Sequence, residues 1–244
     1  MNSSKTQIDR MGERLKAGPS SQTDLVLLDG YRRSFSEAYE VVIVSIRDRL
    51  SLEATGRPAK STSSVIEKLR RETIRLSQIQ DIAGCRVITA NIPKQDEVVD
   101  AIQGLFPGAT QLDRRSAPSH GYRAVHVVAK VSGKLVEVQV RTAMQHLWAE
   151  LSEKLSDVVD PALKYGGGPE EFRSALDVIS KAIEGHESIE KRIAAIDAKE
   201  TETLDETDRA ALREIRKTAV FQKTRLTDQL SEAILKISNG RGKQ

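Results

Sequence analysis

Residues 119–142 carry several side chains of the types that act in catalysis. The stretch reads as two strands joined by Ser132-Gly133, a two-residue hairpin loop in which glycine supplies a positive φ angle. Side chains alternate between the two faces of a strand, so one face of this hairpin gathers polar groups and the other gathers valines. The polar face is predicted to hold Tyr122, His126, Glu137, Gln139 and Arg141. A purely structural hairpin rarely has such a face, and we interpret it as half of an active site.

A second carboxylate that suits the same chemistry is Asp81, at the start of a predicted strand over residues 81–89. If this strand neighbours the one that carries Glu137, the two carboxylates can hold a hard divalent cation. Magnesium takes one or two carboxylates and leaves its other positions to water and substrate phosphates. The pair Asp81 and Glu137 is therefore the predicted Mg²⁺ site.

Hydroxyl and basic side chains cluster where a helix is predicted to begin, near residue 63. They are Arg57, Lys60, Ser61, Ser64 and Lys68. Ser64 and Lys68 are four residues apart and share a helix face, close to the backbone N–H groups that favour an anion at a helix start. Taken alone, this cluster is better explained as an N-cap serine with a solvated basic face. The sequence has no GxxxxGK[ST] or GxGxxG motif, which excludes a P-loop and a Rossmann site.

Together these groups favour metal-assisted transfer of a phosphoryl-type group, in which positioning and charge neutralisation supply most of the catalysis. The basic helix start would hold the phosphates, and Tyr122 offers a flat face for a base. The side chains expected at a second substrate are His126, Gln139, Arg141 and His146. Each residue taken singly has a structural explanation that is at least as good. Their convergence on one face favours the active site.

The elements that position these residues are predicted from hydrophobic periodicity. Helices are expected over residues 31–50, 63–74 and 94–106, and strands over 81–89 and 110–113, followed by the hairpin. Thr142 and Gln145 form a capping box for a further helix to about residue 155, in which Trp148 lies on the buried stripe. This order predicts an α/β (α+β) fold, with a mixed β-sheet flanked by helices.

The two ends of the chain differ from this central part. Residues 1–22 are polar, with a Gly-Pro-Ser-Ser break, and are predicted to be a flexible N-terminal segment. Residues 23–168 form the predicted catalytic domain. Residues 169–244 have long amphipathic patterns, with a capping box at Thr203/Glu206, and predict an antiparallel helical pair. That pair would pack on the core or on a partner, which includes a second copy of the chain.

Composition excludes several classes of protein. Charged residues make up 30% of the chain but the net charge is only +3, too small to indicate a general nucleic-acid binder. The single cysteine, Cys85, rules out an internal disulfide and lies in an apolar run, as a buried thiol would. No apolar run has membrane-spanning length, and the N-terminus has no signal-peptide core, so a cytoplasmic protein without membrane association is expected.

Four ordered motifs resemble the synthetase domain of the RelA/SpoT alarmone synthetase family. They are R-x-x-K-S-x-x-S-V-x-x-K-L over residues 57–69, D-I-A-G-x-R-V over 81–87, H-G-Y-R-x-x-H over 120–126 and V-E-V-Q-V-R-T over 136–142. With the helix after the hairpin, the four motifs extend over residues 57–155. The helix that precedes them extends the match to about residue 31, and the C-terminal helices lie outside it. The resemblance implies a nucleotidyltransferase-like synthetase domain in a small, synthesis-only family member.

The resemblance also implies a reaction and a role for each residue. The reaction is magnesium-dependent transfer of the β,γ-pyrophosphate of ATP to the 3′-hydroxyl of GDP or GTP, with release of AMP. Arg57 and Arg86 would sandwich adenine, and Asp81 and Glu137 would bind the metal, with Glu137 beside the attacking hydroxyl. The expected ATP-phosphate ligands are Lys60, Ser64 and Lys68. The expected acceptor-side residues are Tyr122 stacked on guanine, Arg123, His126, Gln139, Arg141 and His146.

Two departures from the family pattern fall on the acceptor side. Pro118-Ser119-His120 replaces the usual Pro-Lys before Gly-Tyr, so Arg114, Arg115 or Arg123 would have to substitute for that lysine. The usual Glu-His after the tryptophan helix is Ser152-Glu153. An alternative is therefore a toxin-type relative that modifies the 3′ end of tRNA or makes adenosine alarmones and is neutralised by an antitoxin protein. A further alternative is a non-catalytic regulator that acts through the C-terminal helices.

Overall fold

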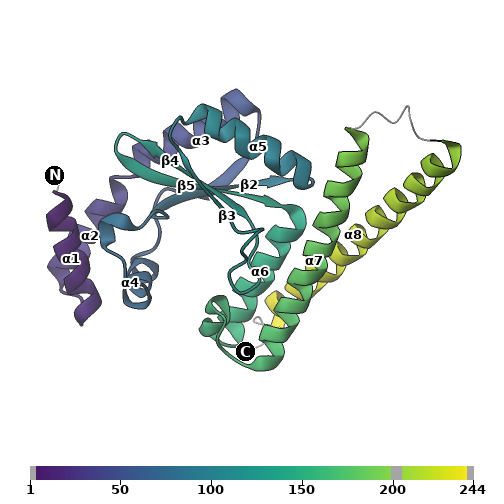
Figure 1. The fold of residues 1–244 in the computed structure, drawn as a ribbon. Coiled ribbons are helices and arrows are strands. Elements are labelled where there is room, and N and C mark those ends of the chain that lie inside the picture. The colour runs from purple at the N-terminus through teal and green to yellow at the C-terminus, as the bar shows by residue number, and fades with distance from the viewer. Residues whose placement is uncertain (1–3, 199–204, 241–244) are drawn as a thin grey trace. The chain divides into compact units, whose positions relative to one another are not determined.

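The computed structural model describes residues 4–198 and 205–240. The elements from the N-terminus to the first sheet strands are α1 (Lys5–Ala17), α2 (Gln22–Arg33), α3 (Ser36–Leu50), β1 (Ala54–Arg57), α4 (Thr62–Arg71), the 3₁₀ turn η1 (Leu76–Gln78) and β2 (Ala83–Thr89). They are followed by α5 (Ile92–Leu105), β3 (Thr110–Asp113), β4 (Val125–Val131), β5 (Lys134–Thr142), α6 (Ala143–Val158), the 3₁₀ turn η2 (Pro161–Tyr165), α7 (Glu170–Asp197) and α8 (Glu206–Gly240). Figure 1 labels these helices, α1 to α8, and the strands β2 to β5.

The strands form one mixed five-stranded sheet in the order β1-β2-β5-β4-β3, flanked by helices, as the sequence predicted. The hairpin loop has φ angles of 48° at Ser132 and 76° at Gly133, the positive values that a primed two-residue turn requires. The valines at 136, 138 and 140 are fully buried. The predicted hairpin and its division into an apolar and a polar face are therefore confirmed.

The chain divides into two compact units. The first unit comprises the chain up to Val87 together with Asp100–Leu112 and His126–Gln139, and the second comprises Ile88–Val99, Asp113–Val125 and the chain from Val140 onward.

In the first unit, the N-terminal helices differ from the sequence prediction. Residues 5–17 are not a loose segment but form α1, which lies beside α4 and η1. Its buried stripe of Ile8, Met11 and Leu15 has helical spacing, and Ser4 caps the helix start. The polar composition of this stretch concealed the stripe. The helix predicted over 31–50 is two helices, α2 and α3, interrupted at Ser34 and Phe35.

Strand β1 was missed by the sequence analysis because Gly56 and Pro58 indicated a break. Gly56 is what allows this strand to pair closely with β2, since a side chain there would meet the Cys85 backbone at 2.5 Å. The register of this antiparallel pair places Ala54 opposite Val87 and Arg57 opposite Gly84.

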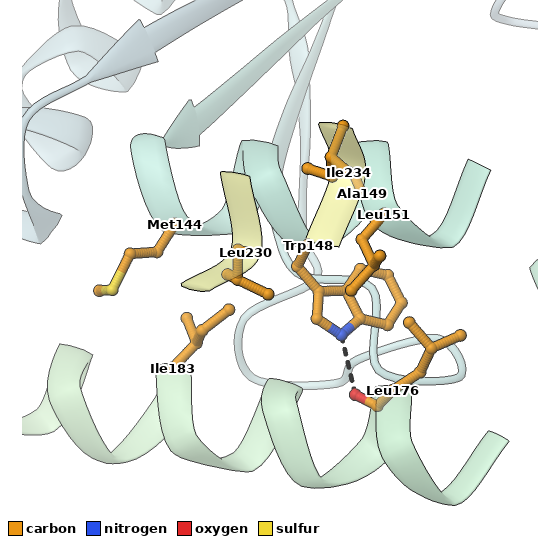
Figure 2. Close-up of a cluster of buried hydrophobic side chains, with 8 residues drawn as sticks. All are labelled: Met144, Trp148, Ala149, Leu151, Leu176, Ile183, Leu230 and Ile234. Atoms are coloured by element: carbon orange, nitrogen blue, oxygen red, sulfur yellow. Dashed lines mark hydrogen bonds between the residues drawn. The ribbon is translucent and has the colours of Figure 1, made fainter. Parts of the chain in front are cut away.

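In the second unit, α6 packs with both C-terminal helices, α7 and α8, which run in opposite directions (Figure 1). The predicted capping box at Thr142 and Gln145 opens α6. Trp148 lies in the shared apolar core of the three helices and its Nε1 donates to the Leu176 carbonyl at 2.8 Å (Figure 2), which confirms its predicted core role. The predicted cap at Thr203 lies outside the described residues. No helix in the described ranges is long and apolar enough to cross a bilayer.

Candidate active site

In the first unit, two lysines close on one aspartate. The Nζ atoms of Lys60 and Lys68 lie 2.6 Å and 2.9 Å from the two carboxylate oxygens of Asp81. Lys60 precedes α4, Lys68 follows almost two turns later, and Asp81 precedes β2. Burial alone would raise the pKa of Asp81, but the two ammonium groups outweigh it and hold this pKa at about 2. The carboxylate is therefore ionised at neutral pH, with its charge neutralised.

The start of α4 is held from two directions. The Lys60 N–H donates to the Ile82 carbonyl at 2.6 Å, which ties it to the beginning of β2. Arg32 at the end of α2 donates from Nε to the Lys60 carbonyl and from a terminal nitrogen to Thr62 Oγ1 at 2.9 Å. Sequence reasoning missed Arg32, because only the tertiary fold brings α2 to this helix start.

The predicted N-cap of α4 is confirmed, since Ser61 Oγ accepts from the Ser64 N–H at 3.2 Å. Ser61 Oγ also lies 2.7 Å from Ser64 Oγ, to which it donates. Ser64 thus lies in the first turn of α4 and Lys68 one turn further along the helix. The structure brings Lys60, Ser64 and Lys68 to one helix start, which is the arrangement that an anion-binding role requires.

The two arginines predicted to hold a base lie on the paired strands β1 and β2. Thr55 is directly opposite Arg86, so their side chains share a face of the sheet. Arg57 is two residues from Thr55 and points to that same face. Arg57 and Arg86 are therefore diagonal neighbours on one face, and the prediction that they bind adenine remains compatible with their positions.

Glu137 in the middle of β5 is 9% exposed and is held by two other predicted site residues. His126 Nδ1 lies 2.9 Å from Oε1, and Gln139 Nε2 donates to Oε2 at 2.7 Å. Burial would raise the pKa of Glu137, but the interactions with His126 and Gln139 outweigh it and lower the pKa. An ionised carboxylate only accepts hydrogen bonds, so His126 Nδ1 carries the hydrogen of this contact.

The negative charge of Asp81 acts on Glu137, since it raises the pKa of Glu137 and so opposes the lowering by His126 and Gln139. A site of three or more acidic, histidine or cysteine ligands does not occur within residues 4–198 and 205–240. Two ionised carboxylates are nevertheless the donor set that magnesium uses when substrate phosphates supply the remaining ligands. The residues present therefore fit a Mg²⁺ ion that enters with a nucleotide.

The remaining acceptor-side residues lie in the second unit. Arg141 donates to Tyr122 Oη at 2.9 Å, and its guanidinium lies 5.0 Å from the centre of the Tyr122 ring. His146 lies on α6 with its Nε2 atom 3.9 Å from a Glu150 carboxylate oxygen. The acceptor-side roles of Tyr122, Arg141 and His146 remain predictions.

Arg123, another predicted acceptor-side residue, is engaged by α7. Its side chain is 6% exposed and donates from Nε and a terminal nitrogen to Glu187 Oε2, at 3.1 Å and 2.6 Å. A guanidinium enclosed in this way and paired with α7 is poorly placed to bind phosphates of an acceptor. Arg115 is likewise engaged, with Asp96 and Asp113 each at 2.7 Å, so it does not fit the role of a substitute for the loop lysine.

Comparison with known proteins assigns the central segment of the chain to a family. Residues 56–156 match the family model described as "Region found in RelA / SpoT proteins". These residues form a RelA/SpoT-family synthetase domain. Every candidate site residue, from Arg57 to His146, lies within the matched segment, whereas α7 and α8 lie beyond it.

Two relatives and one solved structure resemble this chain. An uncharacterised protein of Mycobacterium bovis is 37% identical over 123 residues, which cover 48% of this chain and 45% of that protein. The GTP pyrophosphokinase YjbM of Bacillus subtilis is 34% identical over 146 residues, 52% of this chain and 64% of that protein. The chain thus spans less than two thirds of either relative. The crystal structure of small alarmone synthetase 1 from Bacillus subtilis, bound to its product pppGpp, superposes with a TM-score of 0.56 at 22% identity, over 71% of this chain and 99% of that chain. This likeness confirms the fold.

Proposed function

We propose that the chain is a pyrophosphokinase that makes (p)ppGpp from ATP and GDP or GTP. The acceptor's 3′-hydroxyl oxygen bonds to the β-phosphorus of ATP, and the bond from that phosphorus to the bridging α,β-oxygen breaks. AMP leaves with that oxygen. The hydroxyl proton passes to Glu137, which is ionised and therefore able to accept it.

The observation that carries this proposal is the charge set formed by Lys60, Lys68 and Asp81 beside Glu137. In the structure the ammonium groups of both lysines contact the Asp81 carboxylate, which leaves one positive charge in excess. When a nucleotide triphosphate enters with its cation, the lysines can turn to the phosphates and Asp81 to the cation. Every charge then exchanges one partner for another, and none is left buried alone, which would cost several kcal/mol. The site is thus built to bind an anion and a cation together.

The other donor-side residues extend this arrangement. Ser64 and the first turn of α4 offer hydroxyl and backbone donors to the phosphates. Arg57 and Arg86 share a sheet face and would take the adenine ring between their guanidinium planes. Bound to Asp81 and Glu137, Mg²⁺ would neutralise charge on the transferred phosphates.

On the acceptor side, Tyr122 would stack on the guanine ring, with Arg141 fixing the Tyr122 hydroxyl. His126 and Gln139 would orient Glu137 toward the acceptor, since both hydrogen-bond its carboxylate. His146 would contact the base. A relative whose name is GTP pyrophosphokinase supports a guanine nucleotide as the acceptor. No observation favours tRNA or an adenine nucleotide.

The test is transfer of label from γ-labelled ATP by the purified chain, with GDP, GTP, AMP and deacylated tRNA offered in parallel, each with and without magnesium. We expect a magnesium-dependent, labelled product with GDP and GTP only. Transfer to tRNA or AMP alone would replace the acceptor but keep the donor chemistry. Absence of transfer to every acceptor would refute the proposed function.

A further inference from the structure

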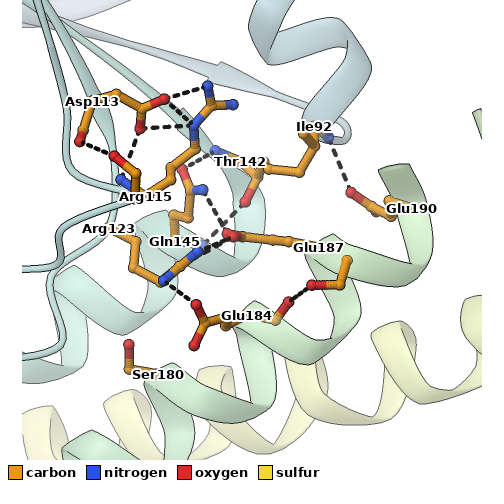
Figure 3. A network of polar contacts seen from close by, with 12 residues as sticks. Ile92, Asp113, Arg115, Arg123, Thr142, Gln145, Ser180, Glu184, Glu187 and Glu190 are labelled. Atoms are coloured by element: carbon orange, nitrogen blue, oxygen red, sulfur yellow. Dashed lines mark hydrogen bonds and ion pairs between the residues drawn. The ribbon is translucent and has the colours of Figure 1, made fainter. Parts of the chain in front are cut away.

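Helix α7 contacts the loop that carries Tyr122. The contacts are at Gly121 and Arg123, the two neighbours of Tyr122 in the chain. On one side, Ser180 Oγ donates to the Gly121 carbonyl at 2.7 Å. On the other, Glu187 accepts two hydrogen bonds from Arg123, as Figure 3 shows. Both anchors are two turns apart on α7 and lie in the second unit with the loop. The main chain of Tyr122 is therefore held between two fixed points.

Both anchors are sealed from water, so they hold the loop rigidly. Ser180 is 5% exposed and Glu187 is 2% exposed. Between them, Gly121 has a φ of 86°, and a side chain there would meet the Trp148 ring at 2.8 Å and Ser180 Cβ at 3.3 Å. Only glycine fits this conformation and this space. The loop is thus pressed against α6 and α7 directly before Tyr122.

The other carboxylate oxygen of Glu187 connects α7 to the element that holds the Tyr122 hydroxyl. Glu187 Oε1 accepts from Gln145 Nε2 at 2.6 Å, and Gln145 is the residue that closes the capping box at the start of α6. Gln95 donates to the Val140 carbonyl at 2.7 Å and to Gln145 Oε1 at 2.9 Å. This network fixes the end of β5 next to Arg141, whose guanidinium donates to Tyr122 Oη.

We propose that Ser180 and Glu187 are positioning residues for Tyr122, and that α7, although it lies outside the matched family segment, determines how tightly the acceptor base is bound. The inference rests on the proposed function, in which Tyr122 stacks on guanine. It gives the C-terminal helical pair a role in acceptor affinity and leaves ATP binding untouched. A merely structural α7 would instead affect both substrates or neither.

The test uses Ser180→Ala, which removes one hydrogen bond to the loop, with Ser156→Ala as a matched control. Ser156 is also a buried serine, but its hydroxyl donates to the Ser152 carbonyl within α6 and does not contact the loop. Loss of one hydrogen bond should weaken GDP binding by Ser180→Ala about fivefold, in both KM and calorimetric Kd. The KM for ATP should stay within about twofold, and Ser156→Ala should leave both constants unchanged.

A second variant tests whether the effect passes through Tyr122. In a Tyr122→Ala background, Ser180→Ala should cause no further loss of GDP affinity, because the side chain that it positions is gone. Glu187→Gln keeps the size of the side chain but removes its charge and one of its two acceptor oxygens, and should also raise the KM for GDP selectively. Its thermal midpoint is measured alongside to separate this effect from loss of fold.

The outcomes separate this inference from the proposed function. Suppose that wild type binds GDP and transfers pyrophosphate, and that Ser180→Ala and Ser156→Ala have the same affinity for GDP. This result overturns the α7 inference alone. Additive losses in the double variant overturn it as well. A wild-type chain that binds GDP more tightly than Ser180→Ala but transfers nothing supports the inference and refutes the reaction. Wild type that neither binds GDP nor transfers label refutes both.

Discussion

Two clusters of paired charges, one in each unit, differ in how far water reaches them. In the first unit, the side chains of Lys60, Lys68 and Asp81 are 14%, 20% and 21% exposed. In the second unit, those of Arg123 and Glu187 are 6% and 3% exposed. Both clusters contain short ion pairs, and the greater exposure of the first favours access by a charged ligand that could take over a partner.

The difference separates a binding site from a structural anchor better than residue type does. Arg123 lies within the family's H-G-Y-R-x-x-H motif and looked like a ligand-binding residue in the sequence. In the structure its guanidinium is enclosed and donates to Glu187 on α7, a contact that anchors the loop. In this chain the charge cluster proposed to exchange partners is partly hydrated, whereas the ion pair between Arg123 and α7 is almost completely buried.

The largest expected effect is on the partly hydrated side. Glu137→Gln should reduce pyrophosphate transfer on the order of 1,000-fold, because a neutral amide neither binds the cation as a carboxylate does nor accepts the hydroxyl proton. Single-turnover transfer from labelled ATP measures this loss. Glu97→Gln, an exposed carboxylate on α5, is the control and should keep full activity. A folded Glu137→Gln chain with near wild-type turnover would break the mechanism.

Substitution in the buried pair of Arg123 and Glu187 should instead lower the stability of the fold. Arg123→Met leaves Glu187 enclosed without its cation and should lower the free energy of unfolding by about 3 kcal/mol. Lys68→Met removes a partly hydrated charge and leaves Lys60 on Asp81, so it should lower this free energy by about 1 kcal/mol or less. Urea unfolding of both variants measures the difference. Equal losses would show that the two clusters do not differ in the way proposed.

The sequence predicts features that adjacent residues determine better than contacts between residues far apart in the chain. The hairpin turn at Ser132-Gly133 and the cap at Thr142 are set by adjacent residues, and both were predicted correctly. The grouping of His126 and Gln139 around Glu137 followed from strand periodicity and is confirmed.

The burial of Arg123 depends on α7, which follows it by about fifty residues, and the grip of Arg32 on α4 depends on the packing of α2. No local pattern encodes these contacts. The buried partner Glu187 left only one signal in the sequence, an acidic residue close to the apolar stripe of α7. That position alone does not identify the cation that it pairs with.

Acid should weaken the first cluster in a defined range of pH. The pKa of Asp81 is about 2 in the folded chain, against an ordinary value of 3.8. Because folding lowers this pKa, the ionised Asp81 carboxylate contributes stability that is present above about pH 4. This stability is lost as the pH falls through the pKa of the folded chain. The difference in unfolding free energy between wild type and Asp81→Asn should therefore shrink by about 2 kcal/mol between about pH 5 and pH 2. A difference that stays constant with pH would contradict the lowered pKa.

The smallest expected effect lies one contact away from the first cluster. Arg32→Ala removes the donors that hold the Lys60 carbonyl and Thr62, so the start of α4 should loosen and the KM for ATP should rise about fivefold. Arg33→Ala is the matched control, since the Arg33 side chain is 78% exposed and pairs with Asp29 on its own helix. Equal KM values in the two variants would remove Arg32 from the description of the site.

The buried cysteine has a practical consequence for labelling the chain with probes. Cys85 is 4% exposed, and burial, assisted by the charge of Glu137, raises the pKa of its thiol to about 12. Thiol reagents act on the thiolate, so the native chain should stay unlabelled at neutral pH. A cysteine introduced in place of the exposed Phe221 on α8 would then be the single reactive thiol, and a spectroscopic probe could report on the C-terminal helices without any removal of the natural cysteine.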